Sequence, residues 1–113
     1  MTDETKELDF ESFRVRPEVL ETVAGLAAGS VDGVASLVGG GLGKKASARG
    51  ISVAVEESSL SVDAHLSVRF GVPMKSLAQA VQKSVSDALY NTTGWPVSRV
   101  EVFVDDVVFD EQD

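Results

Sequence analysis

The segment Leu60–Phe70 alternates strictly between apolar and polar residues, and no other part of the chain constrains the fold as much. Its apolar positions are Leu60, Val62, Ala64, Leu66, Val68 and Phe70. Because successive side chains of a strand point to opposite faces of a sheet, the alternation predicts a strand with one buried face and one polar face. The polar positions are Ser61, Asp63, His65, Ser67 and Arg69, and they include the one histidine of the chain.

Two further strands are expected on the same grounds. Apolar residues alternate with small or polar ones at Ile51, Val53 and Val55, and the short turn 57–59 then leads into the long strand. This arrangement predicts an antiparallel hairpin. The third strand alternates Val100, Val102 and Val104 with Glu101, Phe103 and Asp105, and it continues through residues 107–109.

Helical patterns precede and follow the hairpin. Pro17 and Glu18 are typical of a first helical turn, and the spacing predicts a buried face made of Val19, Leu20, Val23, Leu26 and Ala27. Asp32 and Gly33 should end or kink this helix, with a further turn over residues 34–38. A second helix is expected over about residues 74–91, with Gly94 as a left-handed cap and with Leu77, Val81 and Val85 facing the core.

The resulting order is α-β-β-α-β, which predicts an α+β fold with two helices packed on one face of a three-stranded mixed sheet. A right-handed crossover through the second helix makes the second and third strands parallel. Residues 14–109 should form this single domain, flanked by an acidic flexible tail over 1–13 and an acidic C-terminal tail over 110–113. The opposite sheet face should present Ser52, Glu56, Asp63, His65, Arg69, Glu101 and Phe103.

Charge and composition narrow the function classes. The 113 residues carry a formal net charge of −8, which opposes unaided binding to nucleic acid and to anionic membranes. The chain contains no cysteine, so disulfides and thiolate chemistry are excluded. The acidic N-terminal region resembles no signal peptide, and no apolar run is long enough to span a bilayer. We therefore expect a soluble cytoplasmic protein.

The glycine-rich segment 39–50 is the expected flexible connector. It departs from phosphate-binding loops, because Val38 and Lys45 stand where a Walker pattern needs glycine and Ser or Thr. Its position between a helix and a strand is also the reverse of a dinucleotide-binding fingerprint. Lys44, Lys45 and Arg49 are candidates for a local cationic contact with a partner.

Asp63 and His65 are the one candidate for catalysis, because a carboxylate two residues away on the same strand side can orient an imidazole for general-base work. No nucleophile accompanies them except nearby serines, and side chains at i and i+2 are also the ordinary content of a solvated face. One histidine with scattered carboxylates has no metal-ligand spacing, and we expect no cofactor. Phe103 is more informative, because a large aromatic residue on a polar face indicates a contact. That contact is either a protein partner or the chain's own N-terminal tail or Phe109.

The order of several segments resembles one bacterial family. These are the helix 15–30, the link 31–34, the strand segments 50–55 and 60–70, the turn Phe70–Pro73, the second helix, Thr93–Gly94 and strand 100–104. Together they are similar to the alkaline shock protein family, over roughly residues 15–109. Trp95–Pro96 and the acidic N-terminal extension depart from the family pattern.

The resemblance implies a non-enzymatic cytoplasmic protein of the cell-envelope stress response and homeostasis. Some family members are held at the membrane through a separate membrane-anchored partner, and some self-assemble. The implied role is a scaffold or adaptor with a protein partner, in which His65, Arg69 and Phe103, with Lys44, Lys45 and Arg49, are the candidate interaction surface. The alternative is a small enzyme or ligand-binding domain that uses the face around Asp63 and His65.

Overall fold

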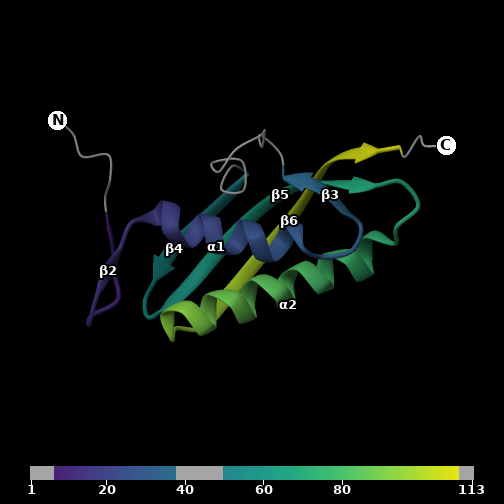
Figure 1. Cartoon of the computed structure of the whole chain (residues 1–113). Helices are drawn as coiled ribbons and strands as arrows, with labels where there is room; N and C mark the ends of the chain where they lie inside the picture. Colours follow the sequence, from purple (N-terminus) through teal and green to yellow (C-terminus); the bar gives the residue numbers. More distant parts are fainter. Residues whose placement is uncertain (1–6, 38–49, 110–113) are drawn as a thin grey trace.

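The alternating segment forms β5 (Ser59–Arg69), the central strand of a mixed sheet in the computed structural model (Figure 1). β4 (Ile51–Glu56) pairs antiparallel with the first half of β5, and β3 (Val34–Leu37) pairs antiparallel with the second half. β6 (Val97–Val108) runs parallel to β5 along its whole length, so it occupies the opposite edge. The structure describes residues 7–37 and 50–109.

The strand register confirms the hairpin and the crossover predicted from the sequence. Glu56 pairs with Ser59 across a two-residue turn. The turn residues Glu57 and Ser58 have φ angles of 41° and 73°, which is the positive-φ geometry whose twist matches that of a hairpin. β6 returns parallel to β5 after α2 (Met74–Thr93), as a single helical crossover requires.

Both helices, α1 (Pro17–Gly29) and α2, cover the same sheet face (Figure 1). The apolar side chains of β5 meet them there, and the core lies between the two layers. Ser84 of α2 donates a 3.0 Å hydrogen bond to the carbonyl oxygen of Ala27, which ties the two helices together. The fully buried residues at this junction include Leu20, Leu60, Val62, Leu66, Val68, Val81, Val85 and Leu89.

α2 follows its predicted pattern, whereas α1 does not. The buried stripe of α2 is Leu77, Val81, Val85, Leu89 and Thr93, and Gly94 caps the helix with a φ of 80°. In α1 the buried residues are Leu20, Ala24, Gly25 and Ala28. The predicted face was wrong at Val19 and Leu26, which are 50% and 62% exposed. Apart from Leu20, the buried residues of α1 are small and let the helix approach its neighbours closely, and this places Val19 and Leu26 outside.

The sheet has one strand more than the sequence predicted. Residues 34–37, expected as a helical turn, form β3 beside the second half of β5. Four residues are too short to show a period of their own, and β5 offers an unpaired edge beyond the end of β4. Hydrogen bonding to that edge satisfies backbone groups of both segments, so tertiary pairing decides the conformation of this stretch.

The body of the domain also extends further toward the N-terminus than residue 14. β1 (Leu8–Asp9) and β2 (Arg14–Val15) form a two-stranded hairpin within the segment expected to be a flexible tail. Phe10 is 2% exposed and packs edge-to-face on Trp95, with ring centroids 4.7 Å apart. Burial of this aromatic ring stabilises the docked hairpin. Residues 1–6 and 110–113 lie outside the described residues.

Candidate functional site

The sheet face opposite the helices, called the open face below, carries the polar residues of β4, β5 and β6. Asp63, His65, Glu101 and Phe103 share this face, as predicted, and the register places Asp63 beside Glu101 and His65 beside Phe103. The neighbouring strand β4 contributes Ser52 beside Asp63, and then Ala54 and Glu56. The charged residues of the open face are Glu56, Asp63, Arg69, Arg99, Glu101, Asp105 and Asp106.

His65 and Phe103 form a stacked aromatic pair at the centre of this face. Their ring centroids are 4.3 Å apart and the ring planes differ by 7°. The imidazole Nδ1 lies 2.9 Å from Asp105 Oδ2, and both side chains are about two-fifths exposed (39% and 40%). The carboxylate and the phenyl ring therefore hold the imidazole in one orientation at the surface.

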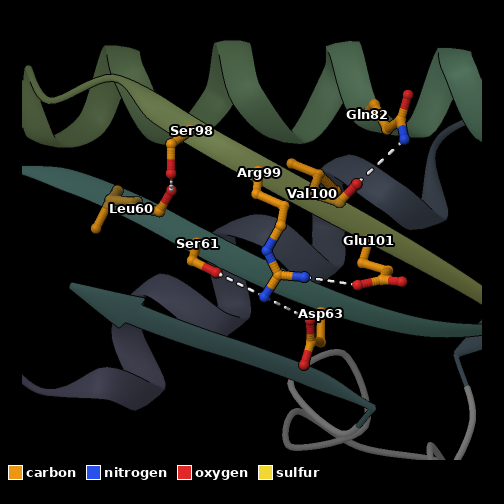
Figure 2. Close-up of polar contacts among 8 residues, drawn as sticks. All are labelled: Leu60, Ser61, Asp63, Gln82, Ser98, Arg99, Val100 and Glu101. Atoms are coloured by element: carbon orange, nitrogen blue, oxygen red, sulfur yellow. Dashed lines mark hydrogen bonds and ion pairs between the residues drawn. The ribbon is translucent and has the colours of Figure 1, made fainter. Parts of the chain in front are cut away.

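Arg99 organises a second group on the same face (Figure 2). Its guanidinium donates to Glu101 Oε1 at 2.6 Å and to Ser61 Oγ at 3.1 Å. The same group lies 3.6 Å from Asp63 Oδ1, an oxygen that is shielded from solvent and makes no hydrogen bond within the described residues. Asp63 is thus held by charge attraction to Arg99, across the boundary between β5 and β6.

This geometry corrects the predicted pairing of Asp63 with His65. Residues i and i+2 of a strand are separated by about 6.5 Å along its axis, whereas adjacent strands lie about 4.8 Å apart. Each side chain therefore takes a partner from β6: Asp63 takes Arg99, and His65 takes Asp105. The carboxylate that orients the imidazole of His65 is that of Asp105. Ser61, considered as a nucleophile, instead accepts a hydrogen bond from Arg99.

The other predicted surface residues divide into two sets. Arg69 is exposed at the end of β5, where its register partner is Val108. Lys44, Lys45 and Arg49 lie outside the described residues. Two aromatic residues of the segments considered as covers for Phe103 contact other rings. Phe10 packs on Trp95, and Phe109 stacks on Phe70 with centroids 4.6 Å apart. Residues 1–6 of the N-terminal segment lie outside the described residues.

Sequence reasoning missed Arg99 and the role of Asp105. Asp105 shares the odd-numbered alternation of Glu101 and Phe103, so its face could be read from the sequence. Its partner could not be read, because that depends on the register between strands separated by a whole helix. A bulge between Leu66 and Ser67 shifts this register and makes Asp105 the unpaired residue beside His65.

Residues 7–37 and 50–109 form neither a cluster of metal ligands nor a membrane-spanning helix. No three His, Cys, Asp or Glu side chains within these ranges come together as metal ligands. Neither helix of this part is long and apolar enough to cross a membrane.

Comparison with known proteins agrees with the order of elements described above. Residues 5–109 match the alkaline shock protein 23 family, described as having a cell envelope-related function. The chain belongs to this family. The match spans both helices, all described strands and the whole open face.

Two relatives have similar sequences. The uncharacterized protein YqhY of Bacillus subtilis (strain 168) is 30% identical over 103 residues, covering 85% of this chain and 76% of its own. The uncharacterized protein Spy1535 of Streptococcus pyogenes serotype M6 is 29% identical over 99 residues, covering 83% and 77%. These relatives support the family and bring no assigned activity with them.

Among solved structures, a variant of the MamM CTD superposes with a TM-score of 0.52 at 15% sequence identity. The match covers 85% of this chain and 97% of that one. A likeness at this level of identity shows a shared fold alone.

Proposed function

We propose that this protein is a non-catalytic cytoplasmic adaptor or scaffold of cell-envelope homeostasis, and that its open face binds a protein partner. The partner is membrane-anchored in this proposal, because the net charge of −8 repels an anionic leaflet. The family's cell envelope-related function supports the cellular role.

The observation that carries the proposal is the partly exposed His65–Phe103 pair on the open face. An aromatic ring in the middle of a polar face offers apolar contact area, and the stack with His65 lowers the entropy lost when a partner docks on it. Aromatic residues surrounded by polar ones are typical of the energetically dominant centre of protein interfaces.

Phe103→Ser tests the interface, with Leu26→Ser as the matched control. Both changes remove a large apolar side chain that is at least partly exposed, but Leu26 lies on α1, on the helical side of the molecule. In the cells that make the protein, Phe103→Ser should release it from the membrane fraction, and Leu26→Ser should not. A large loss of thermal stability in Phe103→Ser would show instead that Phe103 belongs to the core.

The purified protein provides the second arm of this test. It should fail to co-sediment with anionic liposomes at physiological salt, since the adaptor model assigns membrane contact to the partner. Unaided sedimentation would refute the adaptor model, and a protein found only in the soluble fraction of cells would restrict it to a cytoplasmic role.

One observation favours a second function. His65 hydrogen-bonded to Asp105 has the arrangement that orients an imidazole for proton transfer. If the protein is an enzyme of this kind, His65→Ala should abolish its catalytic turnover. Phe103→Ser should leave the turnover intact, provided that the variant still folds. The adaptor instead predicts that both changes weaken partner binding.

A further inference from the structure

We propose that the open face recognises an extended Lys/Arg-rich segment that runs along β6, and that a cation of this segment lies on Phe103. The occupant is the cytoplasmic juxtamembrane segment of a membrane protein. This inference rests on the proposed adaptor function and assigns the chemistry of its partner.

The first support is the position of the Phe103 ring. One of its faces covers His65 of β5 in a nearly parallel stack. The opposite face therefore points away from β5, toward the outer edge of β6. Within the described residues β6 pairs only with β5, so this ring face looks onto an edge where another chain can lie. Arginine and lysine are attracted to such a face within about 6 Å of the ring centroid.

The second support is the pair of carboxylates on either side of the ring. Glu101 and Asp105 precede and follow Phe103 by two residues on the same strand, so all three side chains share the open face. Their side chains are about half and two-fifths exposed. Glu101 already accepts a hydrogen bond from Arg99, and Asp105 already lies against His65. A cation seated on Phe103 would share these two carboxylates with those partners, and neighbouring cations of an extended segment would reach the same carboxylates.

The third support is the charge of the whole face. With histidine counted as neutral, its described residues include five carboxylates and only two guanidinium groups, those of Arg69 and Arg99. The chain as a whole carries −8, which steers a basic partner toward it over distances comparable with the Debye length. Membrane proteins supply such segments, because their cytoplasmic loops next to spanning helices are enriched in Lys and Arg.

The test uses a fluorescein-labelled peptide in which four arginines alternate with serines, and it measures anisotropy with the full chain. Phe103→Leu keeps an apolar side chain but removes the ring, and it should weaken binding about fivefold, the scale of one cation–π contact. The double variant Glu101→Gln/Asp105→Asn should weaken binding about fivefold to tenfold at low salt, the scale of two exposed ion pairs.

Glu18→Gln is the matched control, because it removes one negative charge from α1 and leaves the open face unchanged. It should leave the peptide affinity within about twofold of the parent. If Glu18→Gln lost as much peptide affinity as either open-face variant, the net charge of the protein alone would explain the binding, and the inference would be overturned. Unchanged binding in Phe103→Leu, or no saturable binding by the parent, would overturn it as well.

A membrane arm separates this inference from the adaptor function. The same peptide, carrying a palmitoyl chain in phosphatidylcholine vesicles, should recruit the parent protein and not Phe103→Leu. If the peptide fails to bind while Phe103→Ser still releases the protein from cell membranes, the basic chemistry of the partner is wrong and the adaptor function stands. If the peptide binds but the protein never appears in the membrane fraction, recognition of the basic segment stands, and the adaptor function loses its membrane-anchored partner and is restricted to a cytoplasmic role.

Discussion

Gly33→Ala should destabilise this protein strongly, for two separable reasons. Gly33 links α1 to β3 with a φ of +100°, a conformation that L side chains rarely adopt. A Cβ atom at this position would lie 2.8 Å from Leu77 Cδ1 and 2.9 Å from Val72 Cγ1. The backbone strain costs about 1–2 kcal/mol, and the overpacking adds about 1–3 kcal/mol. The expected loss in the free energy of unfolding is therefore about 2–5 kcal/mol.

Gly71→Ala isolates the backbone contribution. Gly71 has nearly the same φ, +95°, but a Cβ atom added there would meet no heavy atom within 4 Å. Its substitution should cost about 1–2 kcal/mol. Urea denaturation followed by far-UV circular dichroism measures both variants, with the m-value checked for a two-state transition. The difference between them is the cost of the clash.

A double-mutant cycle tests whether Val72 carries part of that cost. Val72→Ala removes one of the two obstructing side chains, so the loss in the double variant should be smaller than the sum of the two single losses, by about 1 kcal/mol. Equal losses in Gly33→Ala and Gly71→Ala would refute the steric argument. No loss in either variant would refute the backbone argument too.

Three other substitutions test single features of the fold. Gly29→Ala, at the open end of α1, should raise the free energy of unfolding by about 0.5–1 kcal/mol in a urea titration. Phe10→Ala should lower it by about 3 kcal/mol and shift the fluorescence of Trp95, the one tryptophan, to the red; an unchanged spectrum would contradict hairpin docking. Burial, then Glu18, raises the pKa of Glu21 above its ordinary 4.5, so its charged form destabilises the fold. Glu21→Gln should therefore be more stable than the parent at pH 7, and the advantage should disappear as the pH falls below about 4.5.

The local sequence pattern was sufficient to predict two kinds of element: those that pair with a neighbour close in sequence, and those in which the pattern repeats many times. The alternation of β5, the β4–β5 hairpin and the fourfold spacing of α2 each repeat often enough to determine an element and its buried side. The crossover rule then made β5 and β6 parallel, and the alternation of β6 placed Phe103 on the open face. The family also followed from the order of these elements.

Tertiary structure decided the remaining features, because each depends on a contact between distant residues. The four residues of β3 become a strand only because β5 has an unpaired edge beside them, and Phe10 is buried because Trp95 lies under the hairpin. On the open face, the sequence by itself determined which side chains share a side. The register across β5 and β6, with its bulge before Ser67, decided that His65 meets Asp105 and that Asp63 meets Arg99. Alternation specifies the face of a side chain, and only the pairing of strands specifies its neighbour.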